Sequence, residues 1–295
     1  EMCIRDSSIA QALASSRTGS IGIIVPELGG PFYSGILHSI EERLRRMGYH
    51  VVVTAGSNTE QSQRESVEFL LGRRVDAMIL HTQSLSDDYL IDLDSKGIPV
   101  VLVNRYIPEM AHSCIEIDNE FGGRMATEYL LRMGHRNIAC ITGPLDRSDA
   151  RGRLQGYRKA LEEAEIAYDE ALVSEAGFTE ESGISAMRKL LKRESGFTAV
   201  FACNDHMAFG AYEVLKAEGI LVPEQISLVG FDDILFARYL TPALTTVNFP
   251  IEQMSAEAVQ LVIQALNKNK RDVNFKLTPN SVSYTHLTLP TTRYV

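Results

Sequence analysis

The stretch SIGIIVPELGGPFYSGILHSIEERLRRMGYHVVVTAG, residues 20–56, decides the fold class. Residues 20–28 form an apolar run that ends at a Gly-Gly-Pro sequence, which predicts a buried strand followed by a loop. Apolar residues then recur at three- and four-residue spacing over 33–47, which predicts a helix, and Gly48 stands where a helix-ending glycine belongs. The apolar run HVVVTAG predicts the next strand.

The same alternation of strand and helix continues along the chain in two series. The first series extends through the apolar runs 75–83 and 98–104, and the second begins near Cys114 and extends to about residue 233. Continuous apolar strands separated by amphipathic helices are typical of a parallel sheet that is covered on both faces. We therefore predict an α/β fold with two doubly wound parallel-sheet lobes, whose strand ends face a shared crevice, the usual ligand position.

Length and charge restrict the class of protein. A chain of 295 residues with 45% apolar residues has room for one large or two medium domains. The net charge of −9 argues against a chain that binds nucleic acid by itself, because such domains are usually basic, although solubility alone also explains this charge. No run of about 18 apolar residues occurs, so we expect no membrane partner, and the first residues lack a secretory signal.

The sequence contains no recognisable set of catalytic or metal-binding residues. The four cysteines, Cys3, Cys114, Cys140 and Cys203, show no CxxC spacing, and the last three lie in apolar runs, which predicts reduced, buried thiols in a cytoplasmic protein. The seven histidines are scattered without metal-ligand spacing. Phosphate-loop, nucleophile-elbow, zinc-protease and dinucleotide motifs are missing from the sequence. We expect no enzyme and no cofactor.

Polar side chains stand at the carboxyl ends of several predicted strands, where ligands bind in open parallel sheets. Asn204 ends one strand, Asp232 ends another, and residues 118–119 end a third. Arg151 and Arg153 open the helix after ITGP, and a guanidinium fork suits paired sugar hydroxyls. Each acid alone could instead cap the next helix, but their recurrence at equivalent ends favours a shared site.

Aromatic residues supply the apolar half of a possible sugar site. Phe32, Tyr33, Phe121 and Phe178 each lie in or beside a loop that follows a predicted strand. The apolar face of a sugar packs on such a ring. The alternative for each ring is ordinary packing in the core.

Several longer segments together have a specific pattern: SSIAQALASSRTGSIGIIVPEL, GPFYSGI, DNEFGGRMATEYLLRMGHRNIACITGP, ARGRLQGYRKAL, VFACNDHMAFGAYEVL, ISLVGFDDILFARYLTPALTTV and IEQMSAEAVQLVI. Through these segments, residues 8–280 resemble the LacI/GalR family of transcriptional repressors. The resemblance implies a two-lobed, periplasmic-binding-protein-like sensor that forms a homodimer and whose chain crosses between the lobes near Asp118, Asn248 and Leu277.

The resemblance also implies a ligand site and a ligand. The positions that match the family's ligand contacts are Phe32, Tyr33, Arg105, Phe121, Arg153, Phe178, Asn204 and Asp232. The segments HTQSLSDDYL and LVNRYIPEMAHSCIEIDNEFGGRMAT are most similar to galactose-responsive members, so galactose or a galactoside is the expected effector. Sugar bound between the lobes would shift their orientation and so alter the operator affinity of the full-length repressor.

The resemblance sets the expected domain boundaries. The hinge helix and its linker would comprise residues 8–17. The N-terminal lobe would comprise residues 18–118 and 248–276, and the C-terminal lobe residues 119–247 and 277–280. Leu13 of the hinge matches the leucine that wedges into the DNA minor groove in full-length repressors.

The two ends of the chain depart from the family pattern. Residues 1–7 and 281–295 read as translated sequencing adaptor, with ordinary flexible termini as the alternative. The family's helix-turn-helix headpiece does not precede the hinge, so operator DNA would be bound only by the full-length protein. The second lobe is expected to lack its edge strand.

A sugar-binding protein that serves a transporter is the alternative function, because that class shares the two-lobed fold. The segment IAQALASSRTGS, before the first strand, reads as a short helix and a polar linker, which favours a tethered DNA-binding domain. The sequence leaves open whether the sugar induces or co-represses, and which operator is bound.

Overall fold

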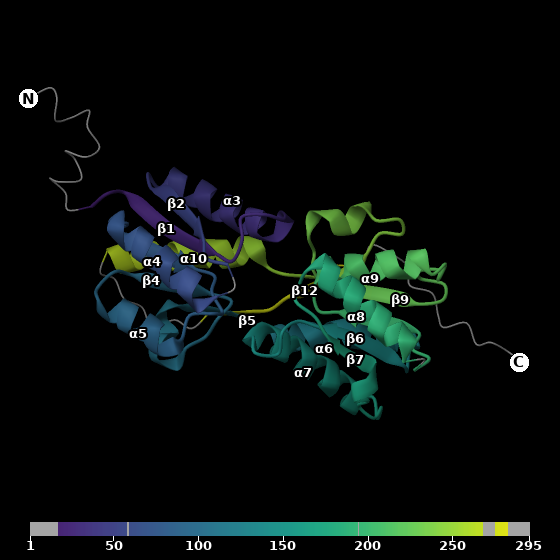
Figure 1. Ribbon diagram of the computed structural model, residues 1–295. Coiled ribbons are helices and arrows are strands. Elements are labelled where there is room, and N and C mark those ends of the chain that lie inside the picture. Colours follow the sequence, from purple (N-terminus) through teal and green to yellow (C-terminus); the bar gives the residue numbers. More distant parts are fainter. Residues whose placement is uncertain (1–16, 58, 194, 268–274, 283–295) are drawn as a thin grey trace, which may run out of the picture. The chain divides into compact units, whose positions relative to one another are not determined.

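The computed structural model describes residues 17–57, 59–193, 195–267 and 275–282 (Figure 1). These residues divide into two compact units: the first comprises the described residues up to Ile117 together with Ile251–Leu277, and the second comprises Asp118–Pro250 and the described residues from Thr278. The chain thus passes from one unit to the other at three points, and the predicted α/β fold of two sheets with three crossovers is confirmed. The hinge prediction for Leu13 falls outside the described residues.

The first unit contains a six-stranded parallel sheet in the order β11-β5-β4-β3-β1-β2. Its strands are β1 (Ser20–Val25), β2 (His50–Ala55), β3 (Ala77–Leu80), β4 (Val100–Val103), β5 (Cys114–Ile117) and β11 (Phe275–Leu277). Its helices are α3 (Pro31–Arg46), α4 (Glu60–Gly72), α5 (Asp87–Ser95), the 3-10 helix η1 (Pro108–Ser113) and α10 (Ile251–Leu266). Parallel pairing brings the carboxyl ends of these strands to one edge of the sheet.

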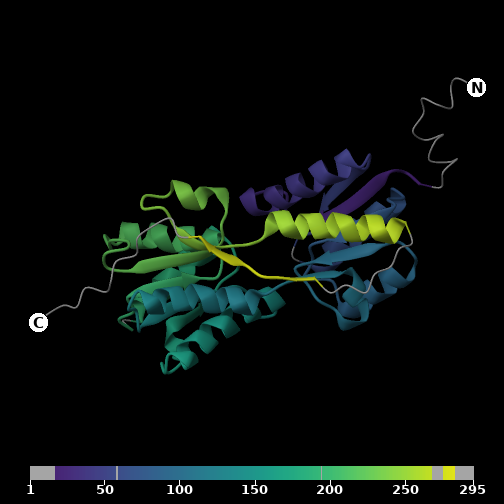
Figure 2. The ribbon, with the colours of Figure 1, turned by 180° about the vertical axis from the view of Figure 1, so that it is seen from behind.

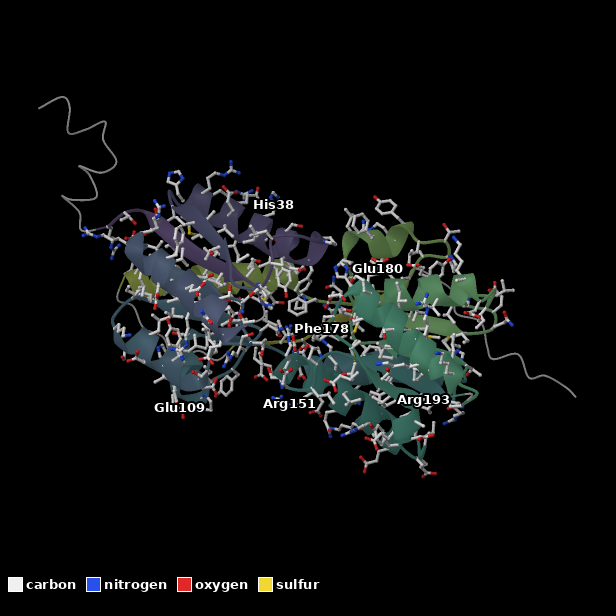
Figure 3. All side chains as sticks on the ribbon, in the orientation of Figure 1. His38, Glu109, Arg151, Phe178, Glu180 and Arg193 are labelled. Carbon is white, nitrogen blue, oxygen red and sulfur yellow. The ribbon has the colours of Figure 1, made fainter. Side chains whose placement is uncertain are left out.

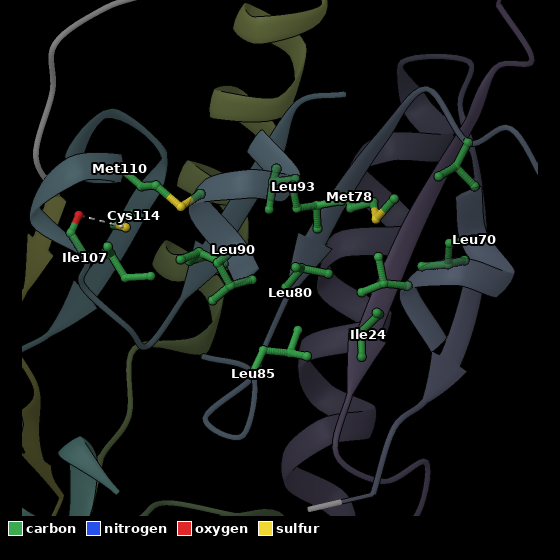
Figure 4. Packing of buried hydrophobic residues seen from close by; sticks show 14 residues of the cluster. Ile24, Leu70, Met78, Leu80, Leu85, Leu90, Leu93, Ile107, Met110 and Cys114 are labelled. Carbon is green, nitrogen blue, oxygen red and sulfur yellow. Dashed lines mark hydrogen bonds between the residues drawn. The ribbon is translucent and has the colours of Figure 1, made fainter. Parts of the chain in front are cut away.

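Helices cover both faces of this first sheet. Helices α3 and α10 pack against each other on one face, and Figure 2 shows α10 along that face. On the other face, apolar side chains of α4 and α5, among them Leu70 and Leu90, pack against Ile24 and Leu80 of the strands (Figure 4). The central strands β3 and β4 are apolar and fully buried because helices cover both faces of the sheet, as the sequence pattern predicts, whereas the edge strand β2 is only half-buried.

The second unit contains a six-stranded sheet in the order β12-β10-β9-β8-β6-β7. Its strands are β6 (Ile138–Thr142), β7 (Val173–Glu175), β8 (Ala199–Ala202), β9 (Ser227–Asp232), β10 (Thr245–Asn248) and β12 (Asn280–Val282). Its helices are α6 (Asn119–Arg132), α7 (Ser148–Glu163), α8 (Glu180–Lys192) and α9 (Asp205–Ala217), with the 3-10 helices η2 (Glu170–Leu172) and η3 (Leu235–Tyr239). Helix α6 pairs with α7 and helix α8 with α9. Within the described ranges, no helix combines the length and the apolar character needed to cross a bilayer.

The edge of the second sheet differs from the expectation. Strand β12 pairs antiparallel with β10, and Asn280 lies opposite Asn248, so the lobe has an edge strand. Ser281 and Val282, which the sequence pattern excludes from the fold, belong to this strand. Edge pairing depends on backbone hydrogen bonds more than on side-chain type, which is why an atypical sequence can complete the ladder.

Glycines allow α6 and α7 to approach each other closely. A Cβ atom on Gly123 would lie 2.1 Å from the carbonyl oxygen of Arg153, and one on Gly156 would lie 2.1 Å from the carbonyl oxygen of Glu120. Both distances are far shorter than a van der Waals contact, so neither position has room for a side chain. The two helices are thereby fixed backbone to backbone, which sets the position of Arg153.

We expect Gly156→Ala to lower the free energy of unfolding by about 1–3 kcal/mol, because the added methyl group forces α6 and α7 apart. Urea unfolding followed by circular dichroism measures the change. Gly72→Ala is the matched control, since a Cβ atom there meets no atom within 4 Å, and it should be neutral or slightly stabilising. Equal stability of the two variants would contradict the packing argument.

The prediction of buried, reduced cysteines is confirmed for the three that the structure describes. Cys114, Cys140 and Cys203 are free and buried. Burial raises the pKa of the Cys114 thiol to about 11, so it stays protonated at neutral pH.

Candidate functional site

Arg153 of α7 lies at the centre of a buried polar cluster at the carboxyl edge of the second sheet. Its side chain is only 3% exposed. Its Nε donates to Asn119 Oδ1 at 2.9 Å, and its Nη1 donates to the Cys203 carbonyl and to Asp232 Oδ1, the latter at 3.3 Å. The guanidinium carbon lies 3.7 Å from the centroid of the Phe231 ring, a cation–π contact. Helix α7 and strands β8 and β9 therefore converge on one guanidinium group.

Asp232, the last residue of β9, is the acidic partner in this cluster. Burial raises the pKa of its carboxyl group to about 7, although the Arg153 guanidinium opposes the shift, and Asp149 adds to it. The carboxyl group therefore keeps its proton to a higher pH than an exposed aspartate does. Such a group accepts hydrogen bonds from hydroxyls when ionised and can donate one when protonated.

The backbone at three positions around this cluster adopts the left-handed region. The φ angle is 111° at Asp232, 55° at Asp233 and 64° at Phe178. None of these residues is glycine, and such conformations cost on the order of 1–3 kcal/mol each unless surrounding contacts hold them. Strained residues of this kind gather at ligand sites, which supports a functional reading of this edge.

Asn204 serves as a helix cap and also fixes the loop before α8. Its Oδ1 accepts from the backbone N–H of Met207 at 2.9 Å and so caps α9. Its Nδ2 donates to the Phe178 carbonyl at 3.0 Å. The amide thus links the carboxyl end of β8 to the loop that carries Phe178.

The Phe178 ring is held at the start of α8 (Figure 3). It lies directly over Gly143, where a Cβ atom would fall 2.2 Å from the ring. The guanidinium carbons of Arg147 and Arg153 lie 4.9 Å and 5.8 Å from its centroid. The structure therefore brings together Arg153, Asp232 and two further predicted site residues, Asn204 and Phe178.

A second ion pair, between Arg147 and Asp149, lies beside the cluster, and the sequence analysis does not predict it. Arg147 Nη2 lies 3.0 Å from Asp149 Oδ2, and Asp149 is buried. Both residues follow β6, so the rule that places ligand groups at strand ends could have found them. Among the described residues, no group of three or more His, Cys, Asp or Glu side chains is placed to hold a metal ion.

Three other polar or aromatic candidates of this unit make contacts of a different kind. Asp118 accepts from the Phe121 N–H at 3.0 Å and so caps α6, and the Phe121 ring lies 5.6 Å from the guanidinium carbon of Arg124. Arg151 donates to the Leu145 and Asp146 carbonyls and is exposed (Figure 3). Both arginines open the same helix, and only Arg153, the one that matches a ligand contact of the family, enters the cluster.

In the first unit, Phe32 and Tyr33 form an aromatic group with His81. The ring centroids lie 5.1 Å apart for Phe32 and Tyr33, 5.3 Å for Tyr33 and His81, and 6.3 Å for Phe32 and His81, all edge to face. Phe32 and Tyr33 follow β1 and His81 follows β3, so parallel strand ends bring the rings together. The sequence analysis did not single out His81, although it also stands at a strand end.

Arg105 stands just beyond β4 of the first unit, at the same edge of the sheet. Its Nη2 lies 2.5 Å from Asp87 Oδ1 at the start of α5, and its Nη1 donates to the Thr82 carbonyl at 3.4 Å. These contacts fix the guanidinium at the carboxyl edge of the sheet, at a position where the resemblance to the family implies a ligand contact.

Comparison with known proteins gives matches over most of the chain. Residues 127–284 match the family model described as "Periplasmic binding protein-like domain". The chain is 38% identical over 261 residues to the HTH-type transcriptional regulator GalR of Escherichia coli (strain K12), which covers 88% of this chain and 76% of GalR. A transcriptional regulator CelR–cellobiose complex is similar with a TM-score of 0.83 and 35% identity, over 93% of this chain and 88% of that chain. A LacI family transcriptional regulator from Enterococcus faecium with bound ribose gives a TM-score of 0.83 at 27% identity, over 92% of this chain and 100% of that chain.

Proposed function

Because the chain belongs to the LacI/GalR family of transcriptional regulators, we propose that it is the effector-binding part of a sugar-responsive repressor. The Arg153 cluster carries the proposal. It combines a buried guanidinium, a carboxyl group, a carboxamide and an aromatic ring at the carboxyl ends of adjacent strands. This set of groups recognises a sugar, since polar groups pair with hydroxyls and a ring packs on the apolar face.

On this proposal each residue of the cluster has a distinct role. Asp232 accepts hydrogen bonds from sugar hydroxyls, and Arg153 donates to sugar oxygens while it holds Asp232 in place. Phe178 packs against the apolar face of the ring. Asn204 positions Phe178 through its carbonyl contact and presents its amide at the same edge.

We propose galactose or a galactoside as the effector. The 38% identity to GalR supports this choice. Among similar structures, however, one holds cellobiose and another ribose, so different regulators of this fold bind different sugars. The relatives are transcriptional regulators, which favours a regulator over the transport alternative.

The remaining expectations belong to the same proposal. Phe32, Tyr33 and Arg105 of the first unit, and Phe121 of the second, would contribute further contacts to the effector. Sugar binding would alter the operator affinity of a cytoplasmic homodimer, and operator DNA would be read by a helix-turn-helix region of the full-length protein.

Thermal unfolding of the purified chain against D-galactose, lactose, cellobiose, D-ribose and hypoxanthine tests the proposal. A sugar at about 100 times its Kd should add about 2.7 kcal/mol of stability, which raises the Tm by several degrees. The Asp232→Asn variant should lose this shift because the amide cannot replace a carboxylate acceptor on both oxygens.

Arg151→Ala provides the matched control for this experiment. Arg151 lies two residues before Arg153 on the same helix but contacts only loop carbonyls, so its removal should leave the sugar-induced shift intact. A shift with another sugar only would retain the proposed function and replace galactose. A shift with hypoxanthine only, or one that survives Asp232→Asn, would overturn the sugar site.

A further inference from the structure

Asp205 is a buried carboxyl group that the proposed sugar contacts do not use. It is the first residue of α9 and follows Asn204, yet its side chain is 0% exposed. Its Oδ2 accepts from the backbone N–H of Ile234 at 2.9 Å, and its Oδ1 accepts from the Thr246 hydroxyl at 2.6 Å. Both oxygens are therefore directed at the turn after β9 and at the neighbouring strand β10.

The hydrogen bonds of this turn continue from Asp205 to the end of β10. The Thr246 hydroxyl, which donates to Asp205, also accepts from the Asp233 N–H at 3.3 Å. Asp233 Oδ2 in turn accepts from Asn248 Nδ2 at 3.0 Å. One carboxyl group and one hydroxyl thus fix the two residues that directly follow Asp232.

The sheet leaves a specific space for this carboxyl group. Gly230 lies opposite Thr246 in the β9–β10 ladder, and a Cβ atom on it would fall 2.1 Å from Asp205 Oδ1. No side chain fits at position 230 while Asp205 occupies its present position. Desolvation by burial raises the pKa of Asp205 well above its usual range, and nearby Asp232 adds to this shift.

The turn that Asp205 holds is the one that presents Asp232. Asp232 and Asp233 both have positive φ angles, of 111° and 55°, and such a backbone persists only where surrounding contacts over-determine it. The hydrogen bonds to Ile234 and Asp233 supply such contacts on the far side of the turn. Without them the strained turn can relax, and the Asp232 carboxyl group then moves away from Arg153.

We propose that Asp205 is a positioning residue for the effector site: together with Thr246 it locks the turn that carries Asp232 against β10. The expected effect on sugar affinity rests on the proposed function, whereas the hydrogen bonds by which Asp205 and Thr246 hold the turn do not depend on it. Asp205 contacts no sugar on this proposal and sets affinity through the position of Asp232.

The test uses two matched pairs of variants in the full chain. Thr246→Val keeps the shape of threonine and removes the hydroxyl, whereas Thr246→Ser retains it. Asp205→Ala removes both acceptors, whereas Asp205→Asn can accept from Ile234 N–H with its oxygen and donate to the Thr246 hydroxyl with its amide. Leu190→Ala, in the buried face of α8, is the control for general loss of stability.

Two measurements are made on each variant: the Kd for D-galactose, cellobiose and D-ribose by calorimetry, and hydrogen exchange at the Asp233 and Ile234 amides by NMR. We expect Thr246→Val and Asp205→Ala to weaken sugar binding at least about tenfold and to accelerate exchange at both amides about tenfold or more. Thr246→Ser, Asp205→Asn and Leu190→Ala should stay within about threefold of the original chain in Kd.

The two readouts separate the failure of this inference from the failure of the proposed function. If the original chain binds none of the three sugars and lactose also leaves its thermal unfolding unchanged, the proposed sugar function fails, and amide exchange alone then decides whether Asp205 and Thr246 hold the turn. Unchanged exchange in Thr246→Val and Asp205→Ala would overturn the lock. Faster exchange with unchanged Kd would overturn the role of Asp205 in positioning Asp232.

Discussion

Replacing Arg153 by methionine is expected to lower the free energy of unfolding by about 3–5 kcal/mol at pH 8. Methionine fills part of the space but cannot neutralise Asp232, whose buried carboxyl group must then either remain ionised without its counter-charge or take up a proton at pH 8. Asn119 Oδ1 and the Cys203 carbonyl also lose the donor that satisfies them. Sugar binding should disappear as well, since Arg153 both contacts the effector and orients Asp232 on our proposal.

Urea unfolding at pH 8 and at pH 5 measures this effect. At pH 5 the Asp232 carboxyl group of the variant is protonated, so the cost should be smaller than at pH 8. Arg151→Met is the control on the same helix and should change stability by less than about 0.5 kcal/mol. A cost below about 1 kcal/mol at pH 8, or one equal at the two pH values, would show that the ion pair does not hold this cluster together.

The second large effect is a pH dependence of stability that comes from Asp232. Its pKa is about 7 in the folded chain and about 3.9 in an unfolded one, so the folded state keeps the proton longer. The stability that the folded chain gains by keeping this proton is fully present below about pH 4 and is lost as the pH rises to about 7. Relative to Asp232→Asn, the original chain should lose up to about 4 kcal/mol over this interval.

The comparison with Asp232→Asn reports the titration of Asp232 together with its coupling to Asp205, whose pKa the Asp232 charge helps to raise. Unfolding free energies are measured by urea titration at half-unit pH intervals between pH 4 and pH 8. If the difference in unfolding free energy between the original chain and Asp232→Asn stays constant, or grows in favour of the original chain as the pH rises, Arg153 compensates the buried charge fully.

The sequence predicts most of the strands because burial leaves a direct pattern in them, although it does not predict the edge strand β12. Runs such as SIGIIV and AVFA form buried strands as predicted, but the strand at Cys114, with which the predicted second series begins, pairs with β4 in the first sheet. The carboxyl-end rule also brings Asn204 and Asp232 to the edge where the structure places them.

The details of the site depend on contacts between distant residues, which periodicity does not reveal. Arg151 and Arg153 lie on the same turn of α7, and only the approach of Cys203 and Asp232 makes Arg153 the buried one. Asp205 is a helix-start acid in the sequence, and its role depends on Thr246, 41 residues away. The ring of Phe121, an effector contact on our proposal, also lies beside Arg124 of the same helix.

The three passages of the chain between the units have a consequence for how the protein is made. The first unit begins at the amino end but needs α10, which packs on α3, and β11, which pairs with β5, and both come after residue 250. The second unit takes all but its last described strand from the continuous stretch Asp118–Pro250. During ribosomal synthesis the later unit can therefore nearly complete its sheet while the earlier one still has an uncovered apolar face. That face is then the part of the nascent chain most exposed to aggregation, and the part on which chaperones would act.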